Sequence, residues 1–166
     1  MKSPQELFEN LKKDDIFQQW SSNHRNNFLS HFFSPLSSDF VLNSEFEVGF
    51  FDSDTGKITV FVSLKNGFEI KPADDVFKKP DENVEPLKFD EVKLSFEEAL
   101  KIFKEESPKQ FPKEQLGGGF VILQTYQSKT IWNFTFITKK LKFINLKINA
   151  ISGKVEDKQN IDLVQK

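Results

Sequence analysis

The chain carries two histidines, and imidazole is the side chain best suited to proton transfer near neutral pH and to binding zinc. His24 and His31 lie seven residues apart, so a helix would place both on roughly one face. No third ligand lies close to them in the sequence. His24 also falls in line with Trp20 and Phe28, a spacing typical of a packed side chain. We expect neither histidine to be catalytic or to bind a metal.

The segment Asp52-Ser53-Asp54-Thr55-Gly56 has the alternating acidic residues of a calcium-binding loop. An EF-hand loop also needs a bidentate Glu at its twelfth position, which here is Ser63. Strand-like segments flank the motif. It therefore predicts a hairpin turn, in which Asp and Gly provide the turn geometry.

Three consecutive glycines, Gly117 to Gly119, could in principle approach a phosphate group. Phosphate loops lead into the N-terminus of a helix, however, whereas these glycines precede the strand-like segment 120–122. We expect a flexible entry loop and no cofactor.

Carboxylates offer the remaining route to catalysis. Glu97-Glu98 and Glu105-Glu106 are predicted at opposite ends of one helix, as solvated charges. The chain has no cysteine, which excludes disulfides, thiolate catalysis and Cys-based zinc sites. We predict that the protein is not an enzyme. The alternative is a carboxylate site that combines Asp52 or Asp54 with Glu97.

Composition limits the classes of partner. The net charge is −2, and Arg25 is the only arginine among 23 basic residues, so nucleic acid is an unfavourable partner. No apolar run approaches the ~18 residues that a membrane span needs.

The start Met1-Lys2-Ser3-Pro4 leads directly into a helical pattern without a secretory apolar region, which predicts a cytoplasmic protein. A longer native N-terminus with a signal would make the protein extracytoplasmic.

Helix starts are well marked in both halves. Ser3 to Glu6 and Ser95 to Glu98 are capping boxes, in which a serine side chain caps the helix and a glutamate follows three residues later. Asp14-Asp15 predicts a second helical segment, whose three- and four-residue spacing of apolar side chains continues to Phe32 and stops at Ser34-Pro35.

Between these helices, apolar residues recur at every second position, which is the pattern of a strand. Strands are predicted around 46–50, 58–62 and 68–70, and Asn66-Gly67 is a strong signal for a hairpin turn. The second half repeats the order with strands at 120–126, 130–137 and 141–150 and a short one near Val155. A Pro- and charge-rich segment, 73–92, separates the halves.

A similar short sequence motif occurs in each half, at 50–58 and 148–155. Each copy contains the end of one predicted strand, a turn and the start of the next strand. The repeat predicts an α+β fold of two tandem units, each a helix plus an antiparallel sheet, packed as one compact protein. The units are predicted at 1–72 and 93–166, with 73–92 as linker.

The second half, from about Leu94 to Gln159, resembles a PepSY-type domain. The resemblance is carried by the helix that opens Ser95-Phe96-Glu97-Glu98-Ala99 and by the final hairpin Ile148-Asn149-Ala150-Ile151-Ser152-Gly153-Lys154-Val155. Asn149 and Ser152 stand where the family usually has Asp and Thr. The resemblance implies a PepSY/cystatin-like fold and a non-catalytic module. Some such modules inhibit proteases as propeptides, and many lie outside the cytoplasm.

One strand suggests where a partner would bind. Trp132, Phe134 and Phe136 share a face of the predicted strand, with Lys139 and Lys140 at its rim. Such aromatic anchors with a charged rim are typical of a binding groove. The alternative is a core strand covered on both faces, which predicts burial of all three rings.

The sequence therefore predicts a binding module for a protein or peptide partner, of a protease-regulatory type by the PepSY resemblance. Carriage of a small apolar ligand in a Phe-lined groove is an alternative, and the chain has 20 phenylalanines to line one.

Overall fold

The computed structural model describes residues 1–75 and 83–163. Its helices are α1 (Pro4–Lys12), α2 (Asp15–Ser22) and α3 (Phe96–Gln110), with a 3-10 turn η1 (Phe89–Glu91) before α3. Its strands are β1 (Asn27–Leu36), β2 (Glu47–Asp52), β3 (Lys57–Leu64), β4 (Gly67–Asp75), β5 (Leu116–Tyr126), β6 (Lys129–Thr138), β7 (Lys142–Asn149) and β8 (Val155–Asp162). Among the helices of these ranges, none is long and apolar enough to cross a membrane.

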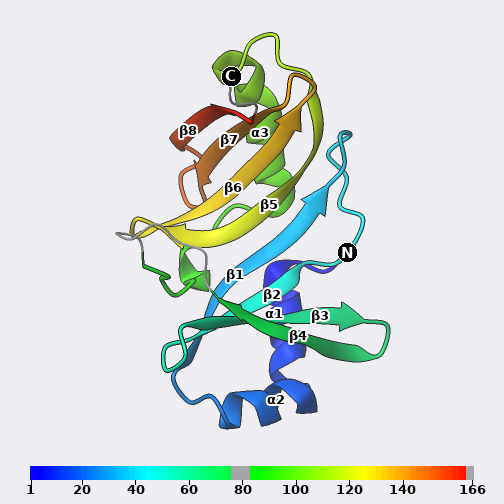
Figure 1. Ribbon diagram of the computed structural model, residues 1–166, viewed down its shortest axis with the longest axis vertical. Helices are drawn as coiled ribbons and strands as arrows, with labels where there is room; N and C mark the ends of the chain where they lie inside the picture. Colours follow the sequence, from blue (N-terminus) through cyan, green and yellow to red (C-terminus); the bar gives the residue numbers. More distant parts are fainter. Residues whose placement is uncertain (76–82, 164–166) are drawn as a thin grey trace.

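All eight strands form one twisted antiparallel sheet in the order β4-β3-β2-β1-β5-β6-β7-β8 (Figure 1). In its middle, β1 pairs with β5 from His31–Gln124 to Leu36–Gly119. The prediction of two tandem helix-plus-sheet units is therefore wrong, because the strands of both halves belong to one sheet. The physical reason is that an unpaired β1 or β5 would expose a row of backbone N–H and C=O groups at an edge, and their pairing satisfies these groups.

The helix starts follow the capping predictions. Ser3 Oγ accepts a hydrogen bond from Glu6 N (3.2 Å), and Ser95 Oγ accepts one from Glu98 N (3.1 Å). Of the predicted linker 73–92, residues 76–82 lie outside the described residues. Leu87, beyond them, is buried and donates its backbone N–H to Leu29 O (2.9 Å), so this part of the segment is attached to β1.

The strand β1 differs from the sequence prediction, which has a helix up to Ser34. In the structure α2 ends at Ser22, and Phe28 and Phe32 both lie in β1. Phe32 faces the core and is fully buried, whereas Phe28 lies on the other face and is half-buried. Apolar residues on both faces remove the period-two alternation that marks a strand, and their four-residue spacing imitates a helix.

The prediction of a flexible loop at Gly117 to Gly119 is also wrong, because these three glycines belong to β5. Gly119 lies opposite Phe136 of β6. A Cβ on Gly119 would overlap the backbone oxygen of Thr135, so the glycine permits close approach of the two strands.

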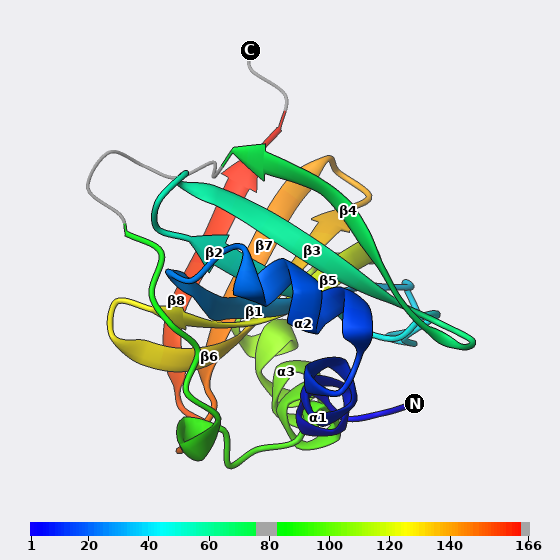
Figure 2. The same ribbon diagram turned by 90° about the horizontal axis from the view of Figure 1, so that it is seen from below.

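One side of the sheet faces the helices. Six fully buried side chains lie opposite one another on β3, β2, β1, β5, β6 and β7: Phe61, Val48, Phe32, Leu123, Trp132 and Ile148. Helix α2 packs Phe17 against Phe61 (5.4 Å between ring centroids), and α3 packs Phe103 against Phe134 of the same sheet side (4.8 Å). All three helices thus lie on this side (Figure 2), and the described chain provides no helix for the other.

Replacing Trp132 with Ala tests this core. The indole contacts Phe46 and Phe96 and donates Nε1–H to Leu94 O (3.1 Å), so we expect the free energy of unfolding to fall by about 3–5 kcal/mol in urea denaturation. Thr135→Ala, on the same strand but the opposite face, is the control and should cost less than about 1 kcal/mol. An unchanged midpoint for Trp132→Ala would show that the ring is not part of the core.

Candidate functional site

The helix-free side of the sheet is the main candidate surface, and we call it the open face. Register and burial assign to it half-buried side chains of five strands: Phe28, His31, Phe33, Phe51, Val60, Val62, Phe120, Ile122, Gln124, Tyr126, Asn133 and Thr135. Rings from neighbouring strands meet there, with centroids 5.3 Å apart for Phe28–Phe51 and 5.6 Å for Phe33–Phe120. Large apolar groups thus remain in partial contact with solvent, which is typical of an interaction surface.

Charge is absent from the centre of the open face. Neither β1 nor β5 contains a Lys, Arg, Asp or Glu residue. Ion pairs flank these two strands instead, between Lys71 of β4 and Glu47 of β2 (2.6 Å) and between Lys129 of β6 and Glu156 of β8 (2.6 Å). An uncharged aromatic centre with a charged rim is the composition of a protein–protein interface.

A β-bulge shapes the middle of the open face. The register of β1 against β2 shifts between Leu29 and His31, so Ser30 is the extra residue. The His31 ring occupies the space above Gly49, where an added Cβ would overlap it. Ser30 Oγ donates to Gly49 O (3.0 Å) and lies 2.8 Å from His31 Nδ1. Since the single hydroxyl hydrogen goes to Gly49 O, Ser30 Oγ accepts from Nδ1–H, and His31 Nε2 is left as an acceptor.

This environment keeps His31 uncharged. Burial lowers the pKa of His31 from 6.5 to about 4, although the nearby Glu47 carboxylate acts in the opposite direction. The sequence pattern predicts a helix here, with His31 on one face with His24, and so gives no sign that His31 lies in the middle of a sheet face. The absence of charge over 27–36 and 116–126 was the available signal.

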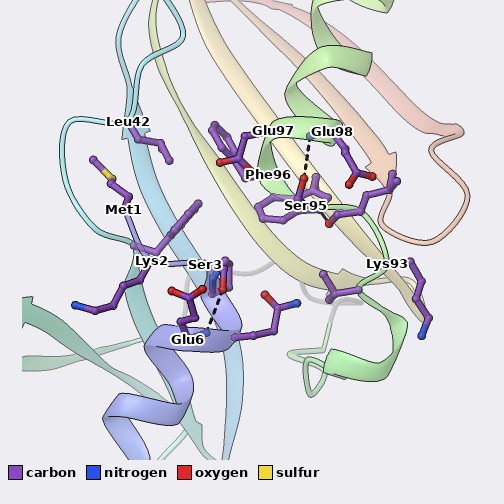
Figure 3. Close-up of a pocket in the computed structure, with 16 residues that line it drawn as sticks. Met1, Lys2, Ser3, Glu6, Leu42, Lys93, Ser95, Phe96, Glu97 and Glu98 are labelled. Carbon is purple, nitrogen blue, oxygen red and sulfur yellow. Dashed lines mark hydrogen bonds between the residues drawn. The ribbon is translucent and has the colours of Figure 1, made fainter.

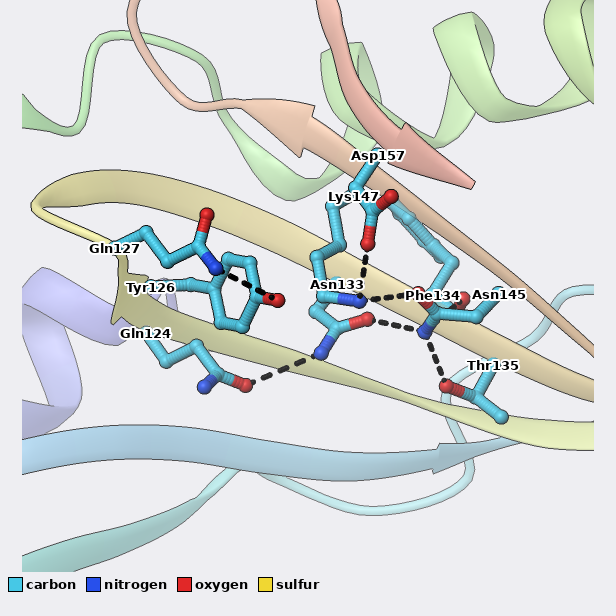
Figure 4. A network of polar contacts seen from close by, with 9 residues as sticks. All are labelled: Gln124, Tyr126, Gln127, Asn133, Phe134, Thr135, Asn145, Lys147 and Asp157. Atoms are coloured by element: carbon cyan, nitrogen blue, oxygen red, sulfur yellow. Dashed lines mark hydrogen bonds and ion pairs between the residues drawn. The ribbon is translucent and has the colours of Figure 1, made fainter. Parts of the chain in front are cut away.

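Next to this centre, amide side chains cross β5, β6 and β7 in a connected network (Figure 4). Asn133 donates to Gln124 Oε1 (3.2 Å), and Asn145 donates to Asn133 Oδ1 and to Thr135 Oγ1. Lys147, only 6 % exposed, donates to Asn145 Oδ1 (2.6 Å).

The charge of Lys147 is also balanced within this network. Asp157 lies 3.4 Å from its Nζ, and the Tyr126 ring lies 4.9 Å away. Because the network partners its own groups, we interpret it as a rigid polar border of the open face.

A pocket of about 300 Å³ lies on the helix side, between the N-terminal ends of α1 and α3 (Figure 3). Phe46, Phe96 and Trp132 form its floor, and their ring centroids are 6.0–6.2 Å apart. Charged residues of both signs stand around it: Lys2, Glu6, Lys93, Glu97 and Glu98. The floor rings are at most 7 % exposed, so an apolar ligand would meet mainly this charged rim.

The residues proposed from the sequence lie apart from the open face. Trp132, Phe134 and Phe136 are each 0 % exposed and face α3, the burial that the core alternative predicts. Lys139 and Lys140 are exposed in the turn between β6 and β7. The structure thus joins the three rings in one cluster and leaves the lysines at the end of the strand.

The carboxylates of the enzyme alternative lie on different parts of the fold. Glu97 lines the pocket, whereas Asp52 and Asp54 lie at the hairpin between β2 and β3 and are not among its lining residues. At that hairpin Asp52 Oδ1 accepts from Asp54 N (2.9 Å), which confirms the predicted turn. Within the described ranges, no three His, Cys, Asp or Glu side chains come together to hold a metal ion.

A double-mutant cycle tests the contact between His31 and Gly49. Gly49→Ala should lower the free energy of unfolding by about 1–3 kcal/mol, because the new Cβ displaces the ring. In a His31→Ala background the same change should cost little. Gly119→Ala is the matched control, since it clashes with backbone and His31→Ala should not rescue it. Equal costs of Gly49→Ala in both backgrounds would contradict the contact.

The lowered pKa of His31 predicts a dependence of stability on pH. The unfolded chain binds this proton more readily than the native state, so the stabilisation is complete above pH 6.5 and is lost as the pH falls towards about 4. The loss should approach about 3 kcal/mol and disappear in His31→Gln, measured as urea unfolding across this range. His24→Gln is the control. Parallel pH profiles for wild type and His31→Gln would refute the assignment.

Comparisons with known proteins find a similar fold but no matching family. No family model and no curated protein matches the chain. Among solved structures, a putative lipoprotein of Clostridium difficile 630 is similar over 88 % of this chain and 90 % of its own, with a TM-score of 0.50 and 11 % sequence identity. At this identity the likeness concerns the fold alone.

Proposed function

We propose that the protein is a non-catalytic binding module that recognises a protein partner through its open face. The observation that carries this proposal is the uncharged centre of that face, where half-buried aromatic and aliphatic side chains of β1 and β5 have no covering helix in the described chain. Aromatic side chains that become fully desolvated supply most of the binding energy at protein interfaces.

The dimensions of the sheet favour a folded partner over a short peptide. Eight strands spaced ~4.8 Å apart, each about nine residues long at ~3.3 Å per residue, span an area on the order of 1,000 Å². A standard interface buries about 800 Å² on each partner, so one folded surface could cover the open face. An extended peptide would cover only one or two strand widths.

The PepSY resemblance of the second half supports a protease or another protein under protease control as the partner. The charged rim of the pocket gives less support to carriage of an apolar ligand. For location, the sequence favours the cytoplasm, whereas the description of the structural neighbour as a putative lipoprotein supports the extracytoplasmic alternative.

Affinity capture with matched variants tests the proposal. The immobilised chain is exposed to an extract of the source organism, and retained proteins are quantified by mass spectrometry. Ile137→Lys adds a charge on the open face, and Ile16→Lys adds one on α2, where the wild-type side chains are 40 % and 42 % exposed. Ile122→Lys adds a charge at the centre of the open face.

We expect a retained protein that Ile16→Lys still binds. Its retention should fall at least about tenfold with Ile122→Lys and less with Ile137→Lys at the rim. Circular dichroism verifies that each variant is folded. A partner retained equally by all variants would place binding elsewhere, and the absence of any retained protein that depends on the open face would overturn the proposal.

A further inference from the structure

The open face contains one hydrogen-bond acceptor that the protein holds in place but does not use. The Ser30 hydroxyl fixes Nδ1 of His31 as the protonated nitrogen, so Nε2 carries a lone pair. Within the described chain, no hydrogen-bond donor contacts Nε2, and the His31 side chain is half-buried.

The side chains around this acceptor are uncharged except for Glu47. Gln124 lies opposite His31 on β5, and Phe33 follows it on the same face of β1. Ile122 of β5 and both Phe51 and Glu47 of β2 lie diagonally to it. A lysine or arginine placed here would lose its hydration among apolar groups, and the nearest carboxylate, Glu47, is paired with Lys71. The donor that fits is therefore a neutral group on a large apolar side chain.

We infer that the partner inserts a tryptophan or tyrosine side chain here, whose N–H or O–H donates to His31 Nε2 while the ring packs on Phe33, Phe51 and Ile122. Indole and phenol are the side chains that combine a large apolar surface with one neutral donor. This inference rests on the proposed function and names the anchor that the open face selects.

The acceptor makes the site selective among aromatic anchors. A phenylalanine would cover Nε2 without a donor, and a desolvated acceptor left unpaired costs more than the hydrogen bond itself contributes. Sites built around a buried hydrogen-bonding group reject analogues that lack the matching group. His31 is thus the specificity-determining residue, and Ser30 is a positioning residue that acts through the tautomer.

Fragment binding by the folded chain tests the inference without knowledge of the partner. The probes are indole and 1-methylindole, which differ in the N–H donor, and phenol and anisole, which differ in the O–H donor. Amide shift changes in ¹H–¹⁵N spectra locate each probe and give its affinity. The imidazole ¹⁵N shifts report the tautomer of His31.

We expect indole and phenol to shift amides of β1, β2 and β5, with the methylated probes about five- to tenfold weaker. His31→Phe should abolish this preference, and His31→Gln, which keeps a neutral acceptor, should retain part of it. Ser30→Ala should weaken the preference and convert part of His31 to the other tautomer. His24→Phe, next to Trp20, is the matched control and should change neither.

The remaining outcomes separate the two proposals. Equal binding of donor and methylated probes on the open face would overturn the role of His31 and leave a binding surface there. Probes that shift only residues around the pocket between α1 and α3, or no residues at all, would overturn the inference. Capture of a partner that depends on Ile122 would still support the proposed function in both cases.

Discussion

The hydrogen bonding between β1 and β5 is the interaction on which the rest of the structure depends. It joins two strands that begin in different halves of the chain and makes one sheet of what would otherwise be two. Because β1 and β5 carry no charged residue, neither has the charged side chains that commonly protect an exposed edge strand. Pairing them removes both edges and leaves the more charged β4 and β8 at the margins of the sheet.

The pairing of β1 with β5 also gives the single sheet two different sides, one covered by helices and one without them. All three helices pack on one side, where their rings meet the buried row from Phe61 to Ile148. The same register places His31, Gln124 and the half-buried aromatics on the other side. The core is thus built mainly from the side chains on one face of the strands, and the side chains on the other face lie on the helix-free side of the sheet.

Local features of this fold could be predicted from the sequence, and long-range features could not. The capping serines and the turn at Asp52 are determined by neighbouring residues, and the structure has them as predicted. The hairpin predicted at Asn66-Gly67 is also present, with Lys65 and Asn66 as its turn residues and Gly67 as the first residue of β4. The strand β1 has apolar side chains on both faces, so its pattern matched a helix as well as a strand. Its partner, β5, is roughly ninety residues away, and no local signal specifies that pairing. The candidate site depends on this pairing, so the sequence pattern alone does not reveal the environment of His31.

The separation between β1 and β5 has a consequence for how the protein forms. Strand pairs that are distant along the chain make folding slow, because a long loop must close before their contacts stabilise anything. On a ribosome, β1 emerges long before β5 is synthesised, and until then its uncharged edge can pair with any other unpaired strand. Helix α1, α2 and strands β2 to β4 are complete by then and can already shield the helix side of β1. Its edge remains open, so non-native strand pairing is expected to be most frequent in the newly made N-terminal half.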